Sequence, residues 1–172
     1  ENGITVMCSN AEFGDTGELN GITYTKRTKE EIQNSGSDTE IATSCTSGIT
    51  DMSAMLMSRT SFIEDISSWD VGNVTSMNRT FLGSTFNQDI GSWDVSNVTT
   101  MEKIFASDHE FNQDISNWNT AQVTNMSGAF SAAHAFNQNI GSWDVSNVTN
   151  MSEMFSHANV FNQDIGSWNT SS

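Results

Sequence analysis

A tryptophan recurs along most of this chain at a nearly constant interval. The five tryptophans stand at positions 69, 93, 118, 143 and 168, so that successive ones are 24 or 25 residues apart. Each ends a copy of one phrase, which reads Phe-Asn-Gln-Asp-Ile-Gly-Ser-Trp in residues 86–93 and again in 161–168. A fixed period of this length is typical of stacked repeats, because one repeat cannot bury its own apolar face.

The repeat unit divides into two halves with different patterns. The Asn-Gln-Asp-Ile half, as in residues 87–90, predicts a short strand that pairs in parallel with the strand of the next coil and carries ladders of Asn and Gln side chains. In the other half, Met151 and Phe155 are four residues apart, which is helical spacing, and Thr149 or Asn150 can cap the helix. The sequence therefore predicts an α/β solenoid whose coils each hold a short parallel β-strand and a short helix.

The apolar residues of each unit predict a narrow, continuous core. Because the methionine and tryptophan columns are regularly spaced, we expect them to be core rather than binding residues, and we expect Trp118 to be nearly buried. One coil points these side chains inward: Phe86, Ile90, Trp93, Val95, Val98, Met101 and Phe105.

The beginning of the chain does not follow the period. Residues 1–44 are expected to form an N-terminal cap, because terminal repeats are normally atypical. In this cap we expect strands at 6–8 and 21–25, a turn-rich connection at 14–21, and a short helix at 29–33. Residues 45–172 are expected to form the solenoid, with repeats starting near Phe62, Phe86, Phe111, Phe136 and Phe161.

Two cysteines, Cys8 and Cys45, lie outside the repeats. If paired, they close a loop of roughly 37 residues, which stabilises a fold by about 3 to 4 kcal/mol on the loop-entropy account. Two free buried thiols are the alternative. We expect the disulfide, because the other signals are those of a secreted chain.

The charge of the chain excludes several classes of partner. Among 172 residues, 21 are acidic and 6 are basic, which gives a net charge of −15. Nucleic acids and anionic membrane surfaces are therefore not expected partners, because both require clustered Lys and Arg. No stretch approaches 18 apolar residues, so no direct membrane insertion is expected.

The repeat resembles that of a known family. The phrase Phe-Asn-Gln-Asp-Ile-Gly-Ser-Trp-Asp-Val-Ser-Asn-Val-Thr-Asn-Met is similar to the repeat of BspA-like leucine-rich-repeat surface proteins of mycoplasmas, Bacteroidetes and some microbial eukaryotes. The segments 14–27 and 45–53 resemble the start of such repeat regions. The resemblance implies a secreted or surface-anchored protein of leucine-rich-repeat-like build, in a family that includes adhesins and offers no catalytic residues to transfer.

Most polar residues recur in every coil, and such recurrence favours a structural role over a catalytic one. We therefore expect no enzyme, no cofactor and no metal site. Calcium bound along the column of Asp89, Asp114 and Asp164 is the alternative to hydrogen bonding in turns. His109 and His134 occupy the same register and are expected to stack.

The repeat also generates possible glycosylation sequons. The alternative is that these asparagines and their hydroxyl partners cap turns, which we favour because the repeat would produce sequons for structural reasons alone. The sequon asparagines are Asn73, Asn78, Asn97, Asn125, Asn147, Asn150 and Asn169.

These observations predict an extracellular or cell-surface, non-enzymatic interaction protein, adhesive in character, whose partner is a protein or glycan ligand or a copy of itself. The alternative is a structural subunit that assembles end to end into a filament or sheath. The chain stops halfway through a repeat, so Phe161, Ile165 and Trp168 are the expected end-on interface. An ice-binding face is less well supported, because the threonines alternate with large apolar residues.

Overall fold

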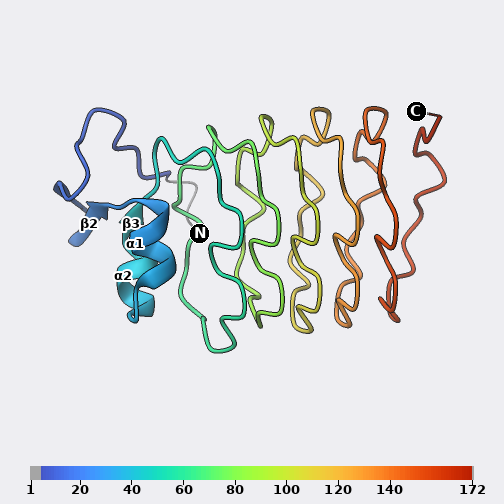
Figure 1. The fold of residues 1–172 in the computed structure, drawn as a ribbon, viewed down its shortest axis with the longest axis horizontal. Coiled ribbons are helices and arrows are strands. Elements are labelled where there is room, and N and C mark those ends of the chain that lie inside the picture. The colour runs from blue at the N-terminus through green and yellow to red at the C-terminus, as the bar shows by residue number, and fades with distance from the viewer. Residues whose placement is uncertain (1–4, 172) are drawn as a thin grey trace.

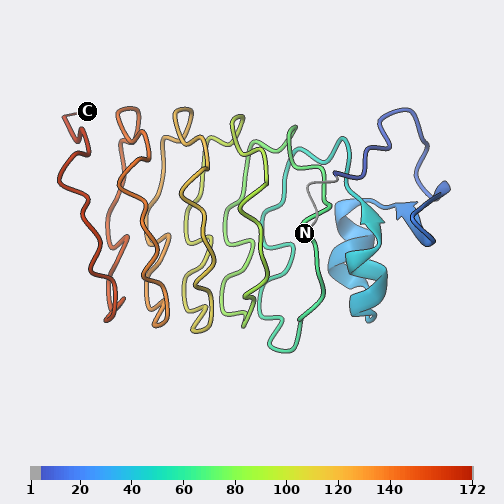
Figure 2. The same ribbon diagram turned by 180° about the vertical axis from the view of Figure 1, so that it is seen from behind.

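The computed structural model describes residues 5–171. The named elements all lie near the N-terminal end: β1 (Thr16–Leu19), β2 (Ile22–Lys26), α1 (Lys29–Asn34), α2 (Asp38–Ala42) and β3 (Ser44–Cys45). Figures 1 and 2 show the rest of the chain as successive coils lying side by side along the long axis of the molecule, with these elements at one end and the last described residues at the other.

A three-stranded sheet in the order β1-β2-β3 starts the fold. β1 and β2 are antiparallel and joined by a tight turn in which Asn20 and Gly21 have φ of 52° and 79°, as the commonest two-residue hairpin requires. The predicted strand at 21–25 is confirmed within one residue by β2. The prediction of a strand at 6–8 is wrong, because these residues form no strand. The segment 14–21, expected to be only a turn, instead contains β1.

Helix α1 begins with a reciprocal cap. The Thr28 hydroxyl accepts a hydrogen bond from the Glu31 backbone N–H at 3.2 Å, and the Glu31 carboxylate accepts one from the Thr28 N–H at 2.7 Å. Ile32 in α1 and Ile41 in α2 are completely buried. The two short helices therefore cover the first coil with their apolar residues, and the predicted helix at 29–33 is confirmed.

Neighbouring coils pair in parallel, but not where a strand was expected. Single parallel bridges link Asp51, Ser76, Thr100, Asn125 and Asn150 in turn, each to the same position of the next coil. The predicted strand at 87–90 is wrong, because that segment forms no strand.

The Asn and Gln of this segment form the expected ladder through their side chains. The Asn112 N–H donates to Oδ1 of Asn87 at 3.0 Å, and Nε2 of Gln113 donates to the backbone oxygen of Asn87 at 2.9 Å. The same bonds recur one coil later at Asn137 and Gln138. Side chains thus link the coils where backbone pairing was predicted.

The predicted short helix around 151–155 is also wrong. The Met154 N–H donates to the Met151 oxygen at 3.1 Å and the Ala158 N–H to the Phe155 oxygen at 3.0 Å, so these bonds span three residues rather than four. The Met154 carbonyl accepts a bond from the Phe130 N–H of the preceding coil at 2.9 Å. The segment is a ribbon of overlapping turns that is hydrogen-bonded to its neighbour.

This ribbon satisfies the same apolar pattern as a helix. Met151 and Phe155 keep their spacing and still pack against the core. A helix would use nearly all its N–H groups internally, whereas the equivalent ribbon of the preceding coil gives every second N–H between Met126 and Ala132 to the carbonyls of this segment. Left-handed residues make this possible, with φ of 57° at Glu153 and 58° at His157. Each such non-glycine residue costs about 1 to 2 kcal/mol.

The tryptophan column lies in the core, as predicted. Trp118 is 3 % exposed, and its ring is parallel to that of Trp143 within 6° at a centroid distance of 6.2 Å. A second column of phenylalanines packs beside it, with the rings of Phe105 and Phe111 3.8 Å apart. Stacked aromatic rings thus run from Phe62 through successive coils to Phe161.

Candidate binding surface

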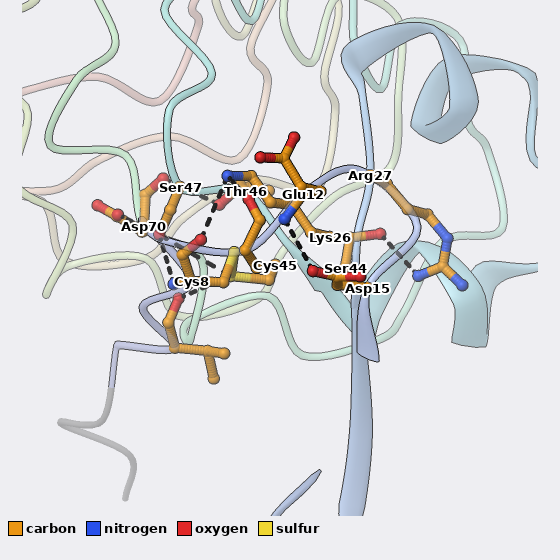
Figure 3. Close-up of a disulfide and its surroundings, with 12 residues drawn as sticks. Cys8, Glu12, Asp15, Lys26, Arg27, Ser44, Cys45, Thr46, Ser47 and Asp70 are labelled. Carbon is orange, nitrogen blue, oxygen red and sulfur yellow. Dashed lines mark hydrogen bonds between the residues drawn. A yellow bond between two sulfur atoms is a disulfide. The ribbon is translucent and has the colours of Figure 1, made fainter. Parts of the chain in front are cut away.

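The predicted disulfide is present and joins the N-terminal segment to β3. The sulfurs of Cys8 and Cys45 are 2.07 Å apart, and Cys45 is buried. Around this bond, drawn in Figure 3, the Cys8 N–H donates to the Ser47 hydroxyl at 3.0 Å. That hydroxyl donates to Oδ2 of the buried Asp70 at 2.6 Å. The neighbourhood is a structural connection between the cap and the first coils.

In two of the sequons, both the asparagine and the hydroxyl partner already hold the preceding coil. Nδ2 of Asn97 donates to the Gly72 oxygen at 2.8 Å, and the Thr99 hydroxyl donates to the Thr75 oxygen at 3.0 Å. Asn147 and its threonine make equivalent bonds. These contacts favour the structural interpretation of the sequence pattern.

The remaining sequons fall into two groups. In Asn125, Asn150 and Asn169 the side-chain oxygen accepts a bond from the backbone N–H two residues later, at 3.0, 3.0 and 3.3 Å. Asn78 is half-buried, whereas Asn73 is exposed and its side chain makes no hydrogen bond within residues 5–171. Glycosylation stays a prediction, and Asn73 is an exposed acceptor whose side chain is not used in a hydrogen bond within residues 5–171.

The last coil is less well covered than the inner ones. Phe161, Ile165 and Trp168 are half-buried, whereas their counterparts one coil earlier are buried. Phe161 stacks on Phe136 at a centroid distance of 5.9 Å, and the Trp168 indole donates to the Ile140 oxygen at 3.2 Å. One face of each side chain is therefore packed and the other is open.

The acidic column considered for calcium forms turns. Oδ1 of Asp89 accepts the Gly91 N–H at 2.9 Å, and Oδ1 of Asp114 accepts the Ser116 N–H at 2.9 Å. The bonds from Ser116 hold the pKa of Asp114 below its usual range. Among residues 5–171, no group of three or more His, Cys, Asp or Glu side chains is placed to hold a metal ion.

The two histidines of the same register stack as expected. The rings of His109 and His134 are 4.4 Å apart with an interplanar angle of 16°, and both are exposed. They form an exposed pair of stacked rings on the surface of two adjacent coils.

One carboxylate is fully buried. Oδ2 of Asp108 accepts bonds from the Ser84 hydroxyl at 2.6 Å and the Phe86 N–H at 3.1 Å, and Oδ1 accepts the N–H groups of Glu110 and Phe111, each at 3.2 Å. Burial raises the pKa of Asp108 to about 6, although these bonds oppose the shift. The same position in each of the next two coils is alanine, so this carboxylate is particular to one coil.

A shallow groove runs across several coils along the turn ribbons. Its volume is about 430 Å³. We call it the edge groove, and it is lined by Met57, Arg79, Leu82, Lys103, Ala106, Ser107, Gly128, Ser131 and Glu153.

Each coil builds the edge groove from equivalent positions of its turn ribbon. Arg79 is left-handed with φ of 58°, and its carbonyl accepts the Leu82 N–H at 3.2 Å. In the next coil Lys103 and Ala106 repeat this arrangement, with φ of 53° at Lys103 and the same bond at 3.2 Å. Apart from Ser107, the groove lining therefore forms two parallel rows, one from the first of the two left-handed residues of each ribbon and one from the residue three positions later.

The charges in the groove change along its length. Arg79 pairs with Glu102 at 3.3 Å across the coil boundary, and Lys103 forms no ion pair within residues 5–171. The stem of Lys103 lies across Gly128, since a Cβ built on that glycine would be 3.1 Å from Cγ of the lysine. Glu153 lies beyond Gly128, so a basic centre is followed by a neutral gap and an acidic end.

Sequence reasoning did not identify the edge groove, although the sequence contains a signal for it. The left-handed position that lines it is different in every coil, while the buried Met and Phe of the same ribbon recur. Aligning the copies column by column reveals this variable position as Ala54, Arg79, Lys103, Gly128 and Glu153, of which all but Ala54 line the groove. Because the core packing does not depend on this variable position, its side chain can determine which ligand group each coil contacts.

Comparison with known proteins gives one match. The family model described as "Mycoplasma protein of unknown function, DUF285" matches residues 26–107 and 83–172. No curated protein matches the chain, and no solved structure matches it. None of the helices in residues 5–171 has the length and apolar character needed to cross a membrane.

Proposed function

The chain belongs to the DUF285 family of Mycoplasma proteins of unknown function, and from this premise we propose that it is an extracellular, non-enzymatic interaction module of the BspA-like surface type. In this proposal the coils form a leucine-rich-repeat-like solenoid, and the edge groove binds a protein or glycan ligand at a surface. Stacked repeats suit this role because they present long, regular binding surfaces.

The disulfide supports an extracellular or cell-surface location. Disulfides persist in oxidising compartments and are rare in the cytosol. The bond between Cys8 and Cys45 is embedded in contacts with Ser47 and Asp70 rather than standing alone, which is the environment of a structural disulfide.

The use of polar side chains supports a non-enzymatic role. Catalysis needs several different polar groups that converge on one point. Here the recurring Asn, Gln and Thr side chains are used to join coils, as Gln113 and Thr99 illustrate. The recurring polar side chains thus hold neighbouring coils together along the molecule.

The observation that carries the proposal is the edge groove, whose lining changes from coil to coil while the core repeats. The test is an array of immobilised matrix proteins, serum proteins and surface glycans probed with the purified chain. We expect at least one ligand to be captured, and we expect Met57→Ser with Leu82→Ser to reduce that capture at least tenfold.

A matched control removes an exposed apolar residue elsewhere. Ile63 is 73 % exposed and does not line the edge groove, so Ile63→Ser should leave capture unchanged. If the parent captures no ligand on the array, the proposed function is wrong. Equal capture by parent and groove variant would assign binding to another surface.

End-to-end assembly is the second candidate, and the half-buried side chains of Phe161, Ile165 and Trp168 favour it. A further coil of the same repeat fits that face, whether it belongs to the same chain or to another copy. Because the net charge is −15, association between copies should strengthen when salt screens their repulsion. Light scattering that reports monomers at both low and high salt would exclude assembly of this chain.

A further inference from the structure

We infer that the edge groove binds an extended peptide with an apolar residue at one end, acidic residues in its middle and a basic residue at its other end. This inference rests on the proposed binding function and names the ligand class for the same surface. Its basis is the order of side chains along the groove.

The length of the groove fits a short extended segment. Its lining comes from consecutive coils that run from Met57 to Glu153, and these coils are joined by parallel bridges. Parallel-paired backbones lie roughly 4.8 Å apart, so four steps between coils span roughly 19 Å. An extended peptide advances about 3.3 Å per residue, so about six residues cover this distance.

The apolar row fixes one end of the ligand. Along the row three positions after the left-handed residues, the side chains become smaller and more polar from one coil to the next, in the order Met57, Leu82, Ala106 and Ser131. Met57 is 44 % exposed, and an exposed methionine adapts its shape to an apolar partner. The apolar residue of the peptide therefore lies over Met57 and Leu82.

The charged row fixes the middle and the other end. Arg79 and Lys103 line the groove from neighbouring coils, in a chain with 6 basic and 21 acidic residues. Arg79 already pairs with Glu102 at 3.3 Å, whereas Lys103 has no ion-pair partner within residues 5–171 and is the basic group left for an acidic ligand. Acidic residues complement this pair, and a basic residue complements Glu153. A sulfated glycan fits less well, because a polyanion would be repelled by the surrounding net charge of −15.

Isothermal titration calorimetry with two synthetic six-residue peptides tests this inference. The first, Leu-Leu-Glu-Asp-Gly-Lys, carries the expected order of charges, and the second, Leu-Leu-Lys-Arg-Gly-Glu, carries the reverse. We expect the parent to bind the first at least tenfold more tightly. Arg79→Glu with Lys103→Glu should reverse this preference, because the charged centre of the groove changes sign.

A charge-matched pair of variants separates a local contact from a general effect of net charge. Arg79→Gln with Lys103→Gln should weaken binding of the first peptide at least tenfold. Ser92→Glu with Gln122→Glu lowers the net charge by the same two units at exposed positions outside the groove, and it should leave binding unchanged.

Two outcomes overturn the inference. One is failure of the parent to distinguish the two peptides, and the other is tighter binding of a heparin hexasaccharide than of the first peptide. If array capture still depends on Met57 and Leu82 in either case, the proposed function stands and only the peptide class is wrong. If array capture is also absent, both fail.

Discussion

The indole Nε1 of Trp118 donates a hydrogen bond to the backbone oxygen of Ile90 in the preceding coil, at 3.1 Å. The same bond joins Trp143 to Ile115 at 3.1 Å. Each of these tryptophans therefore fills the core and also holds the previous coil in register. Trp69 lacks this bond, since its buried Nε1 has no partner within residues 5–171.

This difference between Trp118 and Trp69 predicts unequal responses to the same substitution. Trp118→Phe removes one of the two hydrogen bonds that the Ile90 oxygen accepts, while the bond from the Trp93 N–H remains. It should cost about 1 kcal/mol more than Trp69→Phe, which removes a buried donor that has no partner within residues 5–171. Trp118→Ala should cost roughly 3 to 5 kcal/mol, as large core truncations do. Urea unfolding measures all three, and equal costs for the two Trp→Phe variants would show that the indole bond contributes nothing.

Removal of the disulfide should loosen the N-terminal elements selectively. Cys8→Ser with Cys45→Ser should lower the free energy of unfolding of this region by up to about 3 to 4 kcal/mol. Hydrogen exchange should accelerate at the amides of β2, which pairs with β3, and stay unchanged at the distant Trp143. Equal acceleration in both regions, or free thiols in the denatured and unreduced parent, would contradict this.

Asp108 should make stability fall as pH rises. Its pKa is about 6 in the folded protein, against an ordinary value of 3.8, so between these two values the folded state holds a proton that the unfolded state has released. The contribution is therefore most favourable near pH 4 and is lost as pH rises through 6, with a full range of roughly 3 kcal/mol.

Hydrogen bonds from Ser116 and Ser146 lower the pKa values of Asp114 and Asp144, so these carboxylates contribute to stability with the opposite sign and the measurement must be a difference. The free energy of unfolding of Asp108→Asn subtracted from that of the parent isolates the buried group. This difference should decline between pH 4 and pH 7. A difference that is flat, or that rises with pH, would show that burial does not raise the pKa of Asp108.

Left-handed positions should accept glycine. Ala132 has φ of 55°, so Ala132→Gly relieves about 1 kcal/mol of backbone strain and should not destabilise the protein. Ala121 is also half-buried but is not among the residues with positive φ, so Ala121→Gly should cost roughly 0.5 to 1 kcal/mol. Thermal unfolding of the two variants side by side decides this, and equal destabilisation would argue against the turn ribbon.

Several features of the fold followed from the sequence because they depend on repetition. The burial of Trp118 and the Asn–Gln ladder both follow from residues that recur in every coil. The pairing of Cys8 with Cys45, outside the repeats, followed instead from the signals of a secreted chain. The hairpin strand β1 was missed because all four of its residues are exposed and Leu19 is its one large apolar residue, so the sequence shows no alternation of apolar and polar positions.

The helix was wrongly predicted for a physical reason. A spacing of four between Met151 and Phe155 places both on one face of a helix, but overlapping turns with left-handed residues give the same result. Only the need to hydrogen-bond neighbouring coils distinguishes the two, and that need depends on the stack. The edge groove was missed with it, because its rows are defined by the left-handed positions.

Oxidative footprinting of Met57 tests the central claim most directly. Met57 lines the edge groove and is 44 % exposed, while Met7 is 69 % exposed and lies outside it. When the chain is bound to its strongest array ligand, mass spectrometry should find oxidation of Met57 slowed severalfold and oxidation of Met7 unchanged. If Met57 is oxidised at the same rate with and without the ligand, the edge groove is not the binding surface.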